Sequence, residues 1–503
     1  MKSEPTPAVN KIFAPAFGLF LGLCIWKFGD PVILDQKIFP PTSASEFWTD
    51  AWPTHWAGWI FLPFFVAGIF LILKGPWRRP SGKWLWLLPL GWLGWQFVSA
   101  TQSVDADLTA ATLWQFFGCV ACYFIGVFFF NNRPALNLLL IGVLAAFIFC
   151  LVRAIDQRLV EFPQSRRVLL EGQRDGWTNL PPAVLLEMER EEVIITTNGM
   201  EVANPAVLAR FGKPPPTGLT GLHLALYKLF APAPRVIGTL VYPNALAGIV
   251  LLLGPVSLML AIGAKNLRPA IHGVAVAMIA LLGGAGLFWS GSKLGWLLAM
   301  GVGGLYLLRL DWPTKLKIAA IVTVAVLGLA IFAVRFHHYF ANGATSVGAR
   351  FDYWRAAIRT TVERPIFGTG PGTFQRPYAR LKSPDAEMAR LAHNDYLEQF
   401  SDSGICGGII YLSWILLAVT TLGRRAWRSN DKFAFAIFAG LLAWFIQGFA
   451  EFSLYIPALA WTAFTLLGSQ VAMGSARAPG AVSRAARGTL GDRGAVKVRP
   501  KSN

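Results

Sequence analysis

Long apolar runs constrain this chain more than any other feature, because a chain that is apolar along most of its length needs lipid as its solvent. Of the 503 residues, 54% are hydrophobic and 14% are charged, a balance typical of polytopic membrane proteins. A helix needs roughly 20 apolar residues to cross the hydrocarbon core, and about twelve runs approach that length. They begin near Ile12, Ala57, Trp84, Ala110, Leu136, Leu240, Ala270, Leu294, Leu316, Ile405, Phe433 and Tyr455. The sequence therefore predicts an all-α polytopic membrane protein with about twelve transmembrane helices.

Basic residues fall in alternate loops between these runs and predict the orientation of the chain. The formal net charge is +18, but the Lys and Arg residues form short clusters, as between residues 74 and 83 and between 309 and 317. The intervening loops are poor in basic residues and carry acids such as Asp105 and Glu451. By the positive-inside rule the basic loops are cytoplasmic. We therefore expect both termini in the cytoplasm, and the scattered charge argues against nucleic acid as a partner.

The same alternation divides the chain into six segments. They are spans 1–5 (1–153), a periplasmic insert (154–239), spans 6–9 (240–335), a long periplasmic loop (336–404), spans 10–12 (405–474) and a basic disordered cytoplasmic tail (475–503). Within the insert, Asn198-Gly199 in VIITTNGMEV predicts a hairpin turn in a small folded unit, with a flexible loop as the alternative. No small-residue cleavage site follows the first apolar run, so we expect it to be a retained helix.

The cysteines predict no special chemistry. The five, Cys24, Cys119, Cys122, Cys150 and Cys406, fall in or at the edges of apolar runs. Disulfides and metal sites are unusual there, so we expect neither, and we interpret Cys119-x-x-Cys122 as packing.

Four basic or titratable side chains are dispersed along the chain yet all map to the outer face. Arg235 and Asn244 stand in RVIGTLVYPNALAG, Lys293 lies in the tight turn WSGSKLGW, and Arg350 and His393 lie in the second long segment. Each cation alone is also explained as an anchor at the membrane interface. Together, cations and one titratable base at a membrane surface suit a lipid-linked diphosphate whose leaving group must be stabilised.

Two motifs in the second long segment suggest how such a site is built. In LAHNDYLEQF, an imidazole accepts a proton near neutral pH, and helical spacing would place His393, Leu397, Phe400 and Gly404 on one face. The glycines of GTGPG (368–372) let the backbone turn tightly and present N–H groups to an anion, although glycine-rich turns without a ligand are commoner.

Taken in order, RVIGTLVYPNALAG, SGSK, R-x-x-x-W at 350–354, GTGPGTF and AHNDYLEQFSDSGICGG resemble the O-antigen ligase/polymerase family across roughly residues 235–410. The resemblance implies a membrane glycosyltransferase with the GT-C type of architecture in the bacterial inner membrane. Such an enzyme moves a glycan from undecaprenyl diphosphate to an acceptor hydroxyl at the periplasmic face, without a metal or cofactor. The acceptor is lipid A core, a growing glycan or a protein, and these alternatives stay open. A single displacement would invert the anomeric configuration.

The resemblance also assigns roles to individual residues. His393 matches the family's essential histidine, proposed to activate the acceptor hydroxyl, and Arg235 matches the arginine thought to hold the diphosphate. Lys293 stands where the family often has Arg, which keeps the cation and loses the planar fork. Asp402 stands where Glu is frequent. With Asn244 and Arg350, these cations form the expected substrate-binding set.

Two other classes of function compete with this interpretation. A transporter of a small solute or anion also uses about twelve helices, but transport paths place ionisable groups mid-membrane. Here the apolar runs are almost uncharged, with His272 the exception. The third class, a purely structural assembly protein, has no feature of the sequence in its favour beyond hydrophobicity.

The predicted orientation is testable with single cysteines placed at Ser383 and Ser502 in a background without the native cysteines. A membrane-impermeant thiol reagent should label the first in intact cells and the second only after permeabilisation, since one lies outside and the other inside. The reverse pattern would show that the orientation is wrong.

Overall fold

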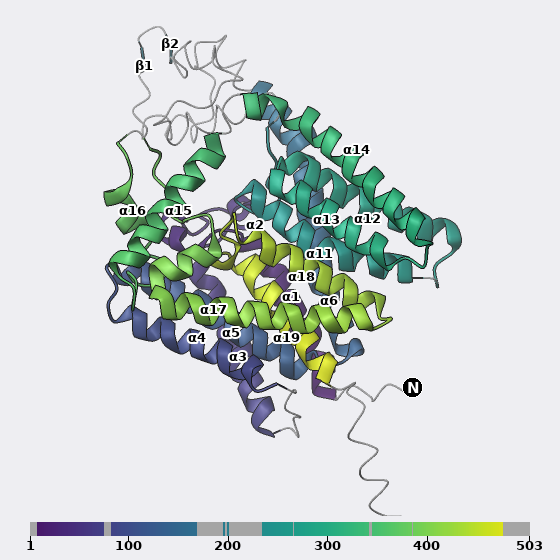
Figure 1. The fold of residues 1–503 in the computed structure, drawn as a ribbon, viewed down its shortest axis with the longest axis horizontal. Helices are drawn as coiled ribbons and strands as arrows, with labels where there is room; N and C mark the ends of the chain where they lie inside the picture. The colour runs from purple at the N-terminus through teal and green to yellow at the C-terminus, as the bar shows by residue number, and fades with distance from the viewer. Residues whose placement is uncertain are drawn as a thin grey trace, which may run out of the picture.

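The computed structural model describes residues 8–74, 82–167, 195–196, 199–200, 234–264, 266–341, 345–384 and 386–475. Helices make up most of this part and pack into one bundle (Figure 1). The long apolar helices are α1 (Ala8–Lys27), α3 (Thr54–Lys74), α4 (Trp84–Ala100), α5 (Ala106–Phe129), α6 (Arg133–Asp156), α11 (Pro243–Gly263), α12 (Pro269–Ser290), α13 (Lys293–Arg309), α14 (Thr314–Ala341), α17 (Asp395–Arg428), α18 (Lys432–Gln447) and α19 (Pro457–Ser475). The other elements are η1 (Val32–Lys37), α2 (Ala44–Thr49), η2 (Gln157–Glu161), β1 (Ile195–Thr196), β2 (Gly199–Met200), α15 (Thr345–Glu363), α16 (Gln375–Leu381) and η3 (Ser453–Tyr455).

Each apolar run predicted from the sequence is one of these long helices. Within the described residues, seven helices are long and apolar enough to cross a membrane: α3, α5, α6 with its continuation, α11, α12, α14 and α17. The predicted all-α polytopic membrane fold is therefore confirmed. The number of crossings stays a prediction, because α1, α4, α13, α18 and α19 are not among the seven.

Close helix pairs hold the bundle together. In the pair α5 and α19, a Cβ at Gly126 would overlap the carbonyl oxygen of Thr465, and a Cβ at Gly468 would overlap that of Tyr123. The helices α1 and α6 approach in the same way at Gly18. Lipid gives little hydrophobic drive for one apolar helix to join another, so close backbone packing at small residues supplies much of the attraction.

The segment 336–404, expected as a long loop, is mostly helical. Helix α14 continues to Ala341, and α15 and α16 then pack near the start of α17 around Tyr353, Phe374 and Tyr378 (Figure 1). A kink at Gly404, with φ 68° and ψ −177°, separates this part of α17 from the apolar run that follows. This small apolar core explains why the segment is ordered. Its periplasmic placement stays a prediction.

The hairpin predicted in the insert is present, with a different register. Strand β1 pairs antiparallel with β2, and Thr196 pairs with Gly199. Gly199 therefore belongs to the second strand and not to the turn. The remainder of the insert beyond residue 167 and up to 233, and the tail beyond Ser475, lie outside the described residues.

The helix contact at Gly468 gives a prediction about stability. Gly468→Ala should lower the thermal midpoint of the protein in detergent, because the added methyl group meets backbone that cannot rotate away; overpacking of this kind costs roughly 1–3 kcal/mol. Gly283→Ala on α12 is the control, since a Cβ there meets nothing within 4 Å. Equal midpoints for the two variants would contradict the proposed contact.

Candidate functional site

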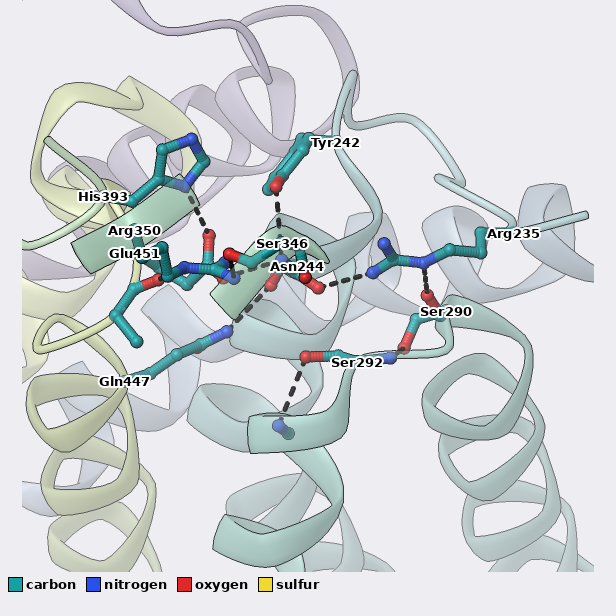
Figure 2. Close-up of polar contacts among 12 residues, drawn as sticks. Arg235, Tyr242, Asn244, Ser290, Ser292, Ser346, Arg350, His393, Gln447 and Glu451 are labelled. Carbon is teal, nitrogen blue, oxygen red and sulfur yellow. Dashed lines mark hydrogen bonds and ion pairs between the residues drawn. The ribbon is translucent and has the colours of Figure 1, made fainter. Parts of the chain in front are cut away.

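Segments far apart in the sequence converge at one end of the bundle. They are the stretch before α11, the turn between α12 and α13, helix α15, the residue pair before α17, and the link between α18 and α19 (Figure 2). They bring together Arg235, Asn244, Arg350 and His393 of the predicted set, with Lys293 beginning α13 beside the turn. Chain separations of up to 207 residues are bridged by direct hydrogen bonds.

The carboxylate of Glu451 lies at the centre of this convergence. Its Oε1 accepts hydrogen bonds from Asn244 Nδ2 and from Arg350 Nη2, each at 2.6 Å. Its Oε2 lies 3.6 Å from His393 Nδ1. Glu451 is buried. The sequence interpretation used Glu451 only to orient a loop; an isolated acid in an otherwise apolar link was the available signal for a site residue.

Asp395 fixes the link that carries Glu451 relative to His393. The backbone N–H of Asp395 donates to the carbonyl oxygens of Gly448 at 2.7 Å and Glu451 at 3.2 Å. Its carboxylate accepts from Leu454 N at 3.3 Å. Because Asp395 follows His393 by two residues, the imidazole and the carboxylate are held in register by backbone contacts.

His393 lies outside helix α17, so the predicted helical face with Leu397 is wrong. Its φ of 50° is left-handed, a conformation uncommon for a residue with a side chain and one that His tolerates better than most. Asn394 then caps α17 by accepting from Tyr396 N and Leu397 N. The left-handed turn aims the imidazole away from the helix axis, toward Glu451 (Figure 2).

Aromatic rings hold the imidazole. Tyr353 stacks on it with centroids 5.8 Å apart, and Phe452 meets it edge-on at 4.7 Å. The His393 side chain keeps an exposed fraction of 20%. The ring is therefore restrained but reachable by a substrate.

Arg235 is held by neutral acceptors. Its Nε donates to Ser290 O and its Nη2 to Asn244 Oδ1, each at 2.5 Å. The stretch that carries it is pinned by Gln157, whose Oε1 accepts from Gly238 N at 2.9 Å. Asn244 thus joins Arg235 to Glu451, with its amide donating to the carboxylate and its carbonyl accepting from the guanidinium.

Lys293 begins α13 directly after the turn that Arg235 contacts. Its Nζ lies 3.6 Å from the ring centroid of Tyr339. Burial, followed by the nearby charges of Arg235, Arg350 and Arg335, lowers the pKa of Lys293 to about 8. Lys293 is outside the seven candidate spans, and three other cations lie close enough to act on it.

The glycine loop does not offer its N–H groups to a ligand. Gly370 N donates to Asp402 O at 2.8 Å, and Gly372 N donates to Asp402 Oδ2 at 2.7 Å. The φ angles of Gly368, Gly370 and Gly372 are 68°, 101° and 76°, which explains the need for glycine. The interpretation of GTGPG as an anion cradle is therefore wrong, and Asp402 holds the loop in place.

Within the described part of the chain, no group of three or more His, Cys, Asp or Glu side chains is placed to hold a metal ion. What the site presents is an imidazole beside a carboxylate, with several guanidinium and ammonium groups around them. Such a set suits proton removal from one reactant and binding of an anionic group on another.

The fold and site define a multi-pass membrane protein with a cationic, histidine-bearing site at one end of its helix bundle. Residues 277–412 match the model of a family described as O-Antigen ligase. The resemblance predicted from the motifs is therefore confirmed for this segment. The segment contains Lys293, Arg350 and His393, while Arg235 and Asn244 precede it.

One relative was also found among curated proteins. An uncharacterized protein of Haemophilus influenzae is 26% identical over 181 residues, which cover 31% of this chain and 44% of that protein. The match thus spans less than half of the relative's length.

The pairing of Glu451 with Arg350 predicts strong coupling between them. Glu451→Gln keeps the shape and removes the charge, so it should destabilise the protein by about 3 kcal/mol, because a poorly solvated cation is left without its counter-charge. Arg350→Met in the same chain should recover part of that loss. Thermal midpoints in detergent for both single variants and the double variant measure the coupling; strictly additive losses would contradict it.

Proposed function

We propose that this protein is an inverting glycosyltransferase that moves a glycan from undecaprenyl diphosphate to an acceptor hydroxyl at the periplasmic face of the bacterial inner membrane. The observation that carries the proposal is the convergence of His393 with Arg235, Asn244 and Arg350 around the Glu451 carboxylate. A base and an anion-binding set within one small region are what attack at an anomeric carbon with loss of a diphosphate requires.

In this proposal His393 takes the proton of the acceptor hydroxyl. Its Nδ1 edge faces Glu451 (Figure 2), which leaves Nε2 to accept the proton. The imidazolium that forms would then be stabilised by the Glu451 carboxylate, as a carboxylate stabilises a catalytic histidine in hydrolytic triads. The acceptor oxygen bonds to the anomeric carbon while the bond to the diphosphate oxygen breaks, and the electron pair leaves with the diphosphate.

The cations receive that leaving group. The described hydrogen bonds of Arg235 go to a carbonyl and an amide oxygen, so no carboxylate among them cancels its charge. Its guanidinium suits two phosphate oxygens at once, whereas Lys293 supplies charge without a fork. None of these steps calls for a metal or cofactor. Ligation to lipid A core, extension of a glycan and transfer to a protein hydroxyl all use this same donor chemistry.

The placement of buried ionisable groups favours an enzyme over a transporter. Among the described residues, those with charged side chains that are buried are Lys27, Asp30, Asp395, Glu398, Asp402 and Glu451. Each lies at or beyond a helix end, or before the kink of α17, on the side assigned to the periplasm. His272, the exception noted in the sequence, lies in the first turn of α12 and contacts Ile262 O at 3.2 Å. A path of charges through the membrane is what transport needs.

The central prediction concerns His393→Asn. Asn tolerates left-handed backbone, so this variant removes the base without straining the turn, and transfer should fall by roughly 100- to 10,000-fold, as expected for loss of a general base. The measurement is glycan transfer by purified protein in lipid, with an undecaprenyl-diphosphate-linked donor, a panel of lipid A core, glycan and protein acceptors, and EDTA present.

His272→Asn serves as the matched control and should transfer at the wild-type rate. Near-normal transfer by His393→Asn would remove the general-base assignment. If the wild-type protein instead moves a labelled anion across vesicles and transfers no glycan to any acceptor, the transporter alternative is correct.

A further inference from the structure

A fourth cation stands beside the proposed diphosphate site. Arg335 lies near the end of α14, and neither the motifs nor the family resemblance singles it out. Its Cζ lies 5.1 Å from the ring centroid of Phe288 and 5.6 Å from that of Phe336. Phe288 precedes by two residues Ser290, whose carbonyl oxygen accepts from Arg235. Arg335 therefore lies beside the end of α12, whose Ser290 binds Arg235.

Arg335 and Lys293 share one aromatic wall. The Nζ of Lys293 lies 5.3 Å from the Phe336 centroid and 3.6 Å from that of Tyr339. Aromatic faces attract cations, with about 0.5–2 kcal/mol per contact, but they do not neutralise charge. Arg335 is also one of the charges that lower the pKa of Lys293, as expected for two cations that contact the same ring.

The positive charge there is not balanced within the described residues. The Nε of Arg335 is buried without a hydrogen-bond partner, and neither Arg335 nor Lys293 has a carboxylate at salt-bridge distance among the residues that the structure describes. The carboxylate whose charge acts on Lys293 is that of Glu451, which is paired with Arg350. Four cations and one carboxylate leave a formal excess of three positive charges. Such an excess at a half-buried site is stabilised by a bound anion.

We infer that Arg335 is a further substrate-binding residue whose charge is matched to the departing diphosphate more than to the intact donor. This inference rests on the proposed function. The diphosphate in the donor is esterified at both ends and carries two negative charges. When the sugar–oxygen bond breaks, the electron pair stays on the diphosphate, which then carries up to three, since a terminal phosphate loses its second proton near pH 6.

A site with three excess positive charges thus matches the up to three negative charges of the departing diphosphate. If one cation is removed, the remaining two excess charges match the two negative charges of the intact donor. Interactions that strengthen as the leaving group departs raise kcat and not donor affinity. Arg335→Gln should therefore lower kcat about 10- to 100-fold, in the range seen when one stabilising donor is removed, with the donor KM changed less than about threefold. Inhibition by added undecaprenyl diphosphate should weaken by a similar factor as kcat.

The experiment compares wild type, Arg335→Gln, Arg335→Lys and Arg235→Gln in the lipid-reconstituted transfer assay. Arg335→Lys retains the charge and should keep most of the activity and the product inhibition, while Arg235→Gln should raise the donor KM. Arg359→Gln on α15 is the control, because Arg359 is a solvent-exposed cation paired with Glu363 and should behave as wild type.

Three results would overturn the inference. The first is unchanged kcat and unchanged product inhibition in Arg335→Gln, and the second is equal loss of activity in the Gln and Lys variants. The third is a raised donor KM in Arg335→Gln with kcat unchanged. If Arg335→Gln folds poorly, the Lys variant still decides, since a purely structural arginine would not be replaced by a lysine that lacks its planar fork. Failure of the proposed function is separate, because it shows as absence of glycan transfer by the wild-type protein itself.

Discussion

The charge interaction of one buried carboxylate with several cations is the constraint on which the candidate site depends. The Glu451 carboxylate accepts hydrogen bonds from Asn244 and Arg350 at 2.6 Å, and its other oxygen lies 3.6 Å from His393 Nδ1. Away from water this attraction is far stronger than at an exposed surface, and an unpaired charge in the same place is far more unfavourable. The backbone contacts of Asp395 keep the carboxylate opposite the imidazole, so the ion-pair network and the start of α17 form one unit.

The membrane decides where such a network is tolerated. Helices that cross lipid satisfy their backbone groups internally and pack closely at small residues. Helix α5 packs in this way on α19 at Gly126 and Gly468. Polar chemistry is confined to helix ends, where carbonyl groups, caps and water are available. The left-handed His393 before α17 and the kink at Gly404 within α17 mark this boundary, because the chain leaves regular helix there.

The imbalance between one carboxylate and four cations suits both halves of the group transfer that we propose. In that proposal the carboxylate supports the base that takes a proton, and the cations beside the aromatic rings of Phe336 and Tyr339 bind the anion that leaves. A fully neutralised site would bind neither a donor nor a leaving group tightly. The aromatic rings hold the cations in place without cancelling their charge, which carboxylates in the same positions would do.

The sequence by itself determined the helices and most members of the candidate site. Helices that cross lipid need apolar runs of nearly fixed length, so the twelve long helices were predictable from hydropathy. Arg235, Asn244, Arg350 and His393 were predictable because a polar side chain beside an apolar run is unfavourable unless it has a partner or a ligand. Only the tertiary structure decided which groups contact one another. Glu451 lies at the centre of the site, and Arg335 lies beside Lys293. His393 lies outside helix α17, and the N–H groups of Gly370 and Gly372 donate to Asp402. The site depends on contacts between residues as far apart in the sequence as 207 positions. The local sequence pattern does not indicate which distant side chains are buried next to one another.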